Sequence, residues 1–201
     1  LTTVCAFFDD ASAVQVAKDH GKADVIVASS VFTHLEDPHQ FIESVKKLLT
    51  DDGRFIIEVE YIGNILRTIQ FERFYLDRIF YYSATSLCHL ADLHGMAVTD
   101  IEQIEPHGGS LQVTIQRKSA GVKPTERVSA LLQAESESLN VERLSAFKTE
   151  VDTQIAAFRR VLEGYRSSGL KVGGYGAPAR VSTICNYGEI GSSLIAFTVD
   201  D

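Results

Sequence analysis

Two apolar, β-branched runs separated by a segment of helical length most constrain the fold of this chain. Residues 24–28 (DVIVA) and 54–59 (RFIIEV) flank a segment that begins at Pro38 and carries apolar residues at helical spacing. Strand, helix and strand in this order form a βαβ crossover, which makes the two strands parallel. Continuous apolar runs are typical of parallel strands covered on both faces. The sequence therefore predicts an α/β fold.

Further elements are predicted on both sides of this crossover. A strand over 4–8 and a helix over 11–20 precede it, and Asp52-Gly53 is a predicted turn into the second strand. Ser83 is a predicted N-cap of a helix that ends at Gly95. The link between the next two predicted strands is short enough to require an antiparallel pair. These two strands cover residues 96–104 and 110–117.

The second half of the chain predicts another α/β unit. Apolar residues at alternating spacings of three and four from Leu144 to Tyr165 indicate one face of a long helix, which Gly169 ends. Strands are predicted over residues 171–175 and 194–199. The segment 119–124 (SAGVKP) has the composition of a linker, so we expect two domains, residues 1–118 and 124–201.

Composition excludes several classes of protein. Nineteen basic and 27 acidic residues give a net charge of −8, which argues against a nucleic-acid partner. The three cysteines form no CxxC pair, so we expect neither a disulfide framework nor a metal site. No apolar run approaches the length of a membrane span. We therefore expect a cytoplasmic protein with a small-molecule partner.

The loop after the first buried run is the first candidate ligand site, because open α/β sheets bind ligands at the carboxyl ends of their strands. The amino-acid sequence of residues 23–38 and 48–59 resembles that around the fourth and fifth strands of class I methyltransferases. That resemblance implies S-adenosylmethionine as cofactor and an adenosyl pocket lined by Ser29, Ser30 and Val31. His34 has two open roles, a pocket residue or a local hydrogen bond at a helix entry.

Four further blocks occur in register and narrow the resemblance. They are FERFYLDRIFYYSATSL (71–87), HGGSL (107–111), GGYGAPAR (173–180) and Asn186-Tyr187. Together they resemble the C-methyltransferases that alkylate nucleotide-linked keto-deoxysugars. The resemblance implies a partial methyltransferase core over 1–118 and a partial nucleotide-sugar-binding α/β domain over 124–201. We expect a polypeptide that is longer at both ends, and weak cofactor binding by these 201 residues alone.

The family chemistry needs a base that removes a proton beside a ketone and a group that stabilises the enolate. The family reads Tyr-His-Glu-His, with the second His as base, where this chain reads Tyr75-Leu76-Asp77-Arg78. Arginine stays protonated and cannot accept the proton. Three accounts remain open: Asp77 or His107 is the base while Arg78 binds the enolate or an anionic group; the substrate has a more acidic carbon or an oxygen nucleophile; or catalysis is lost. Asp77 and Arg78 also remain open as a surface ion pair.

Substrate-binding residues are expected in two glycine-containing loops. Gly108 and Gly109, followed by Ser110, permit positive φ and a close backbone approach to a ligand. In the second half, a strand, a glycine turn and a helix start place backbone amides where a phosphate binds. The resemblance assigns to the substrate Tyr81, Tyr175, Gly176, Ala177 and Arg180, with Tyr175 stacking and Arg180 near the phosphates. The alternatives to a C-methyltransferase are a non-catalytic nucleotide-sugar-binding homologue and an O-methyltransferase on the same core.

Overall fold

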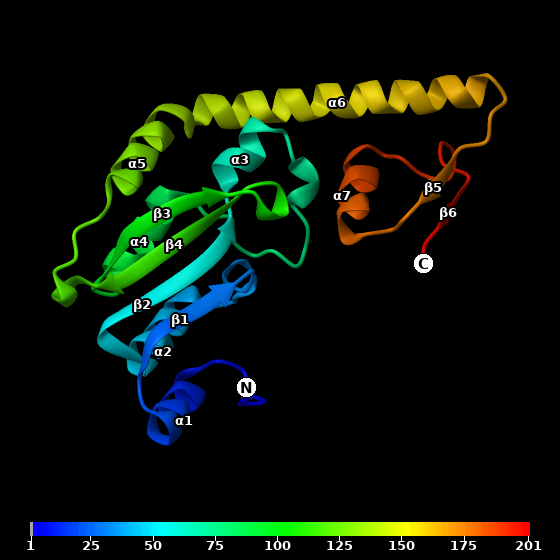
Figure 1. Ribbon diagram of the computed structural model, residues 1–201. Helices are drawn as coiled ribbons and strands as arrows, with labels where there is room; N and C mark the ends of the chain where they lie inside the picture. Colours follow the sequence, from blue (N-terminus) through cyan, green and yellow to red (C-terminus); the bar gives the residue numbers. More distant parts are fainter. Residues whose placement is uncertain (1) are drawn as a thin grey trace. The chain divides into compact units, whose positions relative to one another are not determined.

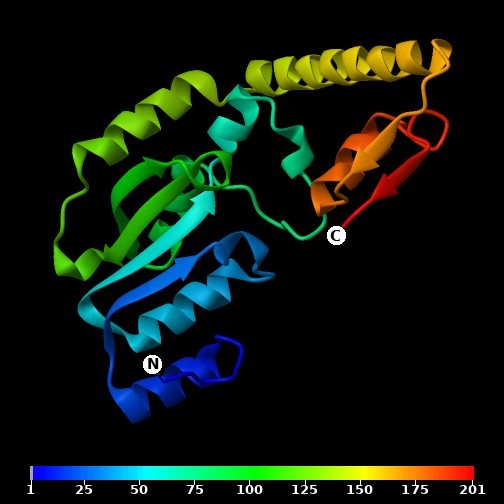
Figure 2. The same cartoon turned by 45° about the vertical axis from the view of Figure 1, so that its right-hand side comes forward.

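The computed structural model of the protein describes residues 2–201, and these divide into two compact units. The first unit contains residues 2–64 and 79–138, and the second contains residues 65–78 and 139–201. The helices and strands of each unit are labelled in Figure 1 and seen from a second direction in Figure 2. Among residues 2–201, no helix combines the length and the apolar character that a membrane crossing requires.

The first unit is built on a mixed four-stranded sheet in the order β1-β2-β4-β3. The strands are β1 (Ala23–Ser29), β2 (Leu49–Glu60), β3 (Met96–Ile104) and β4 (Ser110–Arg117). β1 and β2 are parallel, and β4 is antiparallel to both of its neighbours, β2 and β3. The predicted α/β class, the parallel pair and the antiparallel pair are therefore confirmed.

The helices of the first unit begin where side chains can cap them. α2 (Pro38–Leu48) starts with proline in its first turn, and the Asp37 carboxylate accepts from the Gln40 amide. α4 (Ala84–Leu93) starts at the predicted N-cap Ser83, which forms a reciprocal capping box with Ser86. The remaining helical elements of the unit are α1 (Asp10–His20), the first residues of α3 (Ile62–Arg67), α5 (Glu126–Ser138), and the short turns η1 (Phe32–His34), η3 (Pro106–Gly108) and η4 (Lys118–Ala120).

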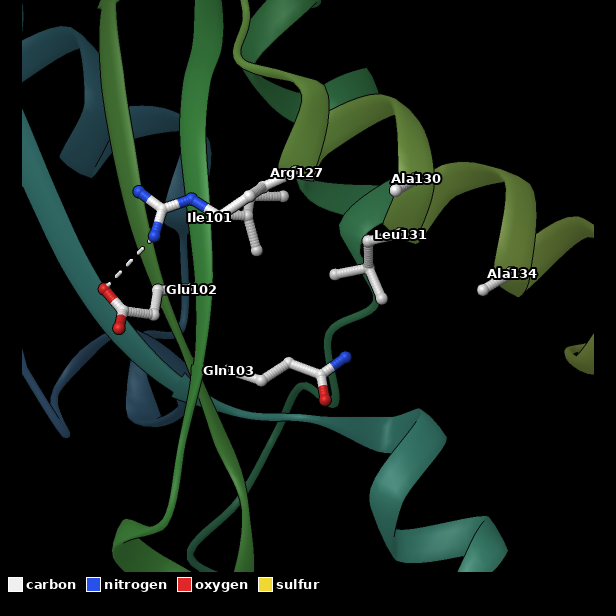
Figure 3. Close-up of a pocket in the computed structure, with 7 residues that line it drawn as sticks. All are labelled: Ile101, Glu102, Gln103, Arg127, Ala130, Leu131 and Ala134. Carbon is white, nitrogen blue, oxygen red and sulfur yellow. Dashed lines mark ion pairs between the residues drawn. The ribbon is translucent and has the colours of Figure 1, made fainter.

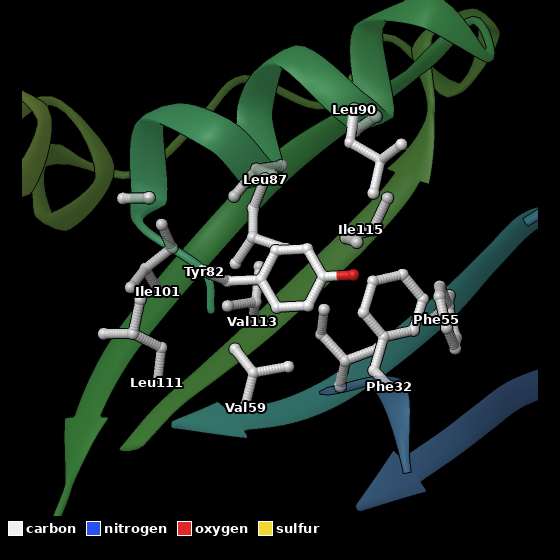
Figure 4. Close-up of a cluster of buried hydrophobic side chains, with 14 of the residues drawn as sticks. Phe32, Phe55, Val59, Tyr82, Leu87, Leu90, Ile101, Leu111, Val113 and Ile115 are labelled. Atoms are coloured by element: carbon white, nitrogen blue, oxygen red, sulfur yellow. The ribbon is translucent and has the colours of Figure 1, made fainter. Parts of the chain in front are cut away.

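The core of the first unit lies on one face of the sheet (Figure 4). Phe55, Ile57 and Val59 alternate along β2, and each is at most 1% exposed. Their partners across β4 are the equally buried Ile115, Val113 and Leu111, so the pairing register aligns apolar rows. Ile42 and Val45 of α2 and the buried residues of α4 belong to the same cluster. This face fixes the register and, with it, the positions of the strand ends.

The opposite face of β1 departs from the prediction of cover on both sides. Val25 and Val27 are 52% and 64% exposed, because in the described part of the chain the core is packed against the other face. β1 is also the last strand of the described sheet, so one of its edges pairs with no described strand. The predicted strand over residues 4–8 is wrong: the segment is irregular and Phe7 is 93% exposed. No described strand lies beside it to complete a hydrogen-bonded ladder.

The Asp52-Gly53 pair was predicted as a turn before β2 but lies inside the strand. β1 pairs Ala23 with Leu49 and then Val25 with Arg54, so residues 50–53 form an irregularity in the ladder. Gly53 is required there, because a Cβ would lie 2.7 Å from the Leu49 side chain. The strand therefore starts earlier than its apolar run indicates.

The second unit contains the predicted long helix and a small parallel strand pair. α6 (Val141–Ser167) is capped by the Asn140 side chain, and Gly169, with φ of 79°, follows its end. β5 (Gly173–Tyr175) pairs with β6 (Phe197–Val199), both shorter than predicted, and α7 (Ala179–Tyr187) lies between them in the chain. A small core forms around Leu162, Ile190 and Leu194. The proposed domain boundary at 119–124 stays a prediction; α5, which follows it, packs in the first unit.

Candidate functional site

Four polar side chains meet where β1 and β2 end, beside the turn between β3 and β4. Ser29 Oγ donates a hydrogen bond to Glu58 Oε2. Ser30 Oγ lies 3.2 Å from His107 Nε2, and the same nitrogen lies 3.9 Å from Glu58 Oε1. We call these four residues the His107 cluster. It joins three predicted site residues to Glu58, which the sequence analysis did not single out.

The sequence itself sets Glu58 apart from its neighbours. It is a carboxylate inside an otherwise apolar strand, between Ile57 and Val59, and it lies at the carboxyl end of that strand. Its side chain is 16% exposed, whereas that of His107 is 45% exposed. A largely buried carboxylate beside an accessible imidazole is an arrangement that active sites use for proton transfer.

The backbone of the cluster is held in an unusual conformation. Ser30 and His107, which face each other, both have positive φ, 54° and 55°. Left-handed φ costs a non-glycine residue energy, and such residues gather at functional sites. Gly108 and Gly109 continue the turn with φ of 74° and 116°, as the sequence predicted for this glycine pair.

Asn64 fixes the glycine turn from the neighbouring chain segment. Its side-chain amide donates to the Gly108 carbonyl, and the Tyr61 amide donates to the Gly109 carbonyl at 3.2 Å. A Cβ on Gly109 would lie 2.2 Å from Asn64 Nδ2, so glycine is required for this approach. The buried Ser110 hydroxyl donates to the Pro106 carbonyl at 3.0 Å and closes the turn. Gly108, Gly109 and Ser110 thus shape the loop that carries His107.

The remaining predicted residues of the first unit are Val31, His34 and Tyr81. Val31 is 46% exposed directly after Ser30, and its carbonyl accepts from the His34 amide at 2.9 Å. His34 is exposed at the end of η1, and its two predicted roles stay open. Tyr81 is half-buried, beside the buried Tyr82. Burial raises the pKa of the Tyr82 phenol, which keeps it neutral in the core.

In the second unit, Tyr75 and Arg78 are joined. Arg78 Nε donates to the Tyr75 hydroxyl at 3.0 Å, and the Arg78 guanidinium carbon lies 5.3 Å from the centre of the Tyr75 ring. Asp77 is exposed between them. Tyr75 also lines a shallow hollow of about 440 Å³. The other residues lining it are Phe74, Leu76, Ser182, Thr183, Asn186 and Tyr187.

The glycine turn of the second unit forms a hydrogen bond with the neighbouring strand β6. The Gly176 amide, at φ of 83°, donates to the Val199 carbonyl at 2.8 Å. Tyr175 is 78% exposed, and its hydroxyl donates to Asp201. Ala177 is exposed before α7, and Arg180 lies in the first turn of that helix. Burial and then the positive charge of Arg180 lower the pKa of Arg73.

A second hollow, in the first unit, contains none of the predicted site residues (Figure 3). It measures about 350 Å³ and lies between β3 and α5. Arg127 at its edge bonds to Asp100 and lies 3.6 Å from Glu102. Burial alone would raise the pKa of Asp100, but hydrogen bonds from Thr125 and Arg127 lower it overall. The charged residues that line this hollow, Arg127 and Glu102, are already in ion pairs. The hollow therefore lacks the reactive groups of the His107 cluster.

Comparisons with known protein families divide the chain into two consecutive matches. Residues 2–101 match a methyltransferase domain, and residues 105–201 match a C-methyltransferase C-terminal domain. The chain therefore belongs to the methyltransferases. Its second half identifies it further as a member of the C-methyltransferase family.

One curated relative and two solved structures are similar to parts of this chain. The chain is 30% identical to the C-methyltransferase NovU of Streptomyces niveus over 98% of its own length, and it spans about half of that relative, 48%. A methyltransferase structure from Anabaena variabilis is 14% identical and covers 57% of each chain, with a TM-score of 0.43. The magnesium protoporphyrin IX methyltransferase of Synechocystis, solved with bound SAH, is 14% identical over 52% of this chain and 48% of its own, with a TM-score of 0.37.

Proposed function

We propose that the protein acts as a C-methyltransferase on a carbon beside the ketone of a nucleotide-linked sugar, with His107 as the base. The observation that carries this proposal is the His107 cluster at the carboxyl ends of β1 and β2. It offers an accessible imidazole whose Nε2 is engaged by Ser30 and faces Glu58. In the described part of the chain, Nδ1 of the same ring has no hydrogen-bond partner. That nitrogen is available to accept a proton from carbon.

The end of β1 fits part of an S-adenosylmethionine site. Ser30 presents a hydroxyl on a left-handed turn, and the exposed apolar Val31 follows it. A polar and an apolar group together suit the ribose and the base of an adenosyl moiety, and strand carboxyl ends are where α/β sheets bind such ligands. When bound, the cofactor supplies a methyl group on a positively charged sulfur. We assign Ser29, Ser30 and Val31 to this site and leave His34 as a candidate.

Arg78 is assigned to charge compensation because it cannot act as a base. The Tyr75 hydroxyl and ring hold its guanidinium in place, which preorganises a positive charge for an anionic group. In the second unit, Arg180 in the first turn of α7 is assigned to the phosphates of the substrate. The exposed ring of Tyr175 is available to stack on a base.

The experiment that tests the proposal separates proton removal from methyl transfer in the full-length protein. A nucleoside-diphosphate keto-deoxysugar in deuterated water reports proton exchange beside the ketone by NMR, and labelled S-adenosylmethionine reports transfer. His107→Asn is the informative variant, because asparagine tolerates the left-handed φ of this position. We expect exchange and transfer both to fall by about 100-fold or more, the usual contribution of a general base.

Two further variants complete this test. His20→Asn, an exposed histidine of α1, is the matched control and should keep full activity. Asp77→Asn should retain exchange if His107 is the base. Loss of exchange in Asp77→Asn with full exchange in His107→Asn would transfer the role to Asp77. Full activity in both variants would contradict the proposal, and methyl transfer to oxygen in the product would favour the O-methyltransferase alternative.

A further inference from the structure

Glu58 is a carboxylate in a largely buried, mostly apolar run, residues 55–59 of β2. It lies in β2 between two fully buried apolar residues, with its side chain on the opposite face of the sheet from theirs. Its partners in the pairing register are Ser29 on β1 and Gln112 on β4. Ser29 Oγ donates to Oε2. Glu58 Oε1, by contrast, is buried and accepts no hydrogen bond.

A buried carboxylate oxygen without a donor is costly, and a native structure retains one where function uses it. The nearest cationic or donor partner recorded for Oε1 is His107 Nε2, at 3.9 Å. At this distance the pair is an ion-pair contact and not a direct hydrogen bond, and the carboxylate charge acts on the ring at close range. Ser30 Oγ, 3.2 Å from the same nitrogen, adds a second acceptor. Both neighbours favour a proton on Nε2.

From this geometry we propose that Glu58 is a positioning residue for His107, one that keeps the imidazole proton on Nε2 and leaves the Nδ1 lone pair as the base. This inference rests on the proposed function and deepens it. A carboxylate behind a histidine commonly fixes the tautomer of the ring and its orientation. The left-handed backbone of His107 and the Asn64 contact to Gly108 hold the turn from which the ring projects.

The proton transfer then balances within the cluster. The bond between carbon and hydrogen beside the ketone breaks, and a bond between Nδ1 and hydrogen forms. The electron pair of the broken bond moves to the ketone oxygen as the enolate. The imidazolium that results carries its positive charge next to the Glu58 carboxylate, which stabilises it in a partly buried setting. Glu58 itself exchanges no proton with the substrate.

The test uses the full-length protein with Glu58→Gln and Glu58→Asp. Glutamine keeps the shape of the side chain but removes the charge and offers Nε2 a donor, so the opposite tautomer becomes favourable. We expect kcat to fall by about 10-fold to 100-fold in Glu58→Gln, the size typical of removing the partner behind a histidine. KM should change little. Glu58→Asp should recover part of the rate, and Glu105→Gln, which removes an exposed carboxylate near the same turn, should behave as the unaltered protein.

A spectroscopic readout separates positioning from simple structural support. Long-range proton–nitrogen NMR correlations distinguish the two tautomers of a neutral histidine without any turnover. We expect the Nε2-protonated ring of His107 in the unaltered protein and the Nδ1-protonated ring in Glu58→Gln. The same tautomer and the same kcat in both proteins would overturn the role of Glu58 while leaving His107 as base. Full activity in His107→Asn would instead remove the proposed function itself.

Discussion

Replacing Glu135 by alanine is expected to lower the free energy of unfolding of the first unit by about 3–5 kcal/mol, the range seen when a buried, hydrogen-bonded charge is removed. Glu135 is 2% exposed, and its carboxylate accepts from the amides of Ala84 and Thr85 at 2.6 and 2.8 Å. It also accepts from the Thr85 hydroxyl at 2.6 Å. An anion at the N-terminus of α4 satisfies orphan amides and complements the helix dipole.

The loss is large because no other group can replace this carboxylate. Ser83 already accepts from the Ser86 amide, so the side chain of Glu135 supplies the acceptors for the first two amides of α4. Burial and the neighbouring carboxylate also raise the pKa of Tyr61, whose phenol therefore remains a neutral donor to Glu135. Alanine would leave four donors without this acceptor, the Ala84 and Thr85 amides and the Thr85 and Tyr61 hydroxyls, and a cavity beside them.

Urea unfolding followed by circular dichroism, with hydrogen exchange of the α4 amides, measures this effect. Glu135→Gln keeps one acceptor oxygen in place and should lose less stability than alanine. Glu137→Ala, at an exposed position of the same helix, should change stability by no more than about 0.5 kcal/mol. An equal loss in Glu135→Ala and Glu137→Ala would show that the buried carboxylate contributes no more than a surface residue does.

Local patterns were sufficient to predict the elements that make up the sheet. β-branched runs identified β1 and β2, and the capping signals at Pro38 and Ser83 located the starts of α2 and α4. The same patterns gave a strand at residues 4–8, where the structure has none. An apolar run indicates that a segment can pair, whereas a strand also requires a neighbour that supplies hydrogen bonds, and that information is not local.

The candidate site was also predictable only where local features mark its residues. Ser30 and His107 were identified from their positions after a strand and in a glycine loop, which are local features. Their 3.2 Å approach joins residues 77 positions apart and depends on the pairing of β1 with β2 and of β2 with β4. The roles of Glu58 and Asn64 follow from that pairing, because each acts on a residue distant in the chain. Glu135 was missed for the same reason, since its partners lie on another helix.

Gly109→Ala is expected to cost about 3 kcal/mol of stability and to reduce methyl transfer, because a side chain there meets both a backbone and a packing penalty. The φ of Gly109 is 116°, a conformation that alanine rarely adopts. Its Cβ would lie 2.2 Å from Asn64 Nδ2, and Asn64 holds the adjacent Gly108 carbonyl. Either the amide or the turn must move, and the turn carries His107.

The matched control for this variant is Gly121→Ala. Gly121 also has positive φ, 68°, but a Cβ there would have no atom within 4 Å, so the backbone penalty stands alone at about 1 kcal/mol. Thermal unfolding measures the two losses, and deuterium exchange beside the substrate ketone measures displacement of His107. Asn64→Ala removes both the clash with a Cβ at position 109 and the hydrogen bond to the Gly108 carbonyl. The double variant Asn64→Ala/Gly109→Ala should therefore lose less stability than the sum of the losses in the two single variants. Equal stability losses in Gly109→Ala and Gly121→Ala, with unchanged exchange, would mean that the contact with Asn64 does not hold the turn that presents His107.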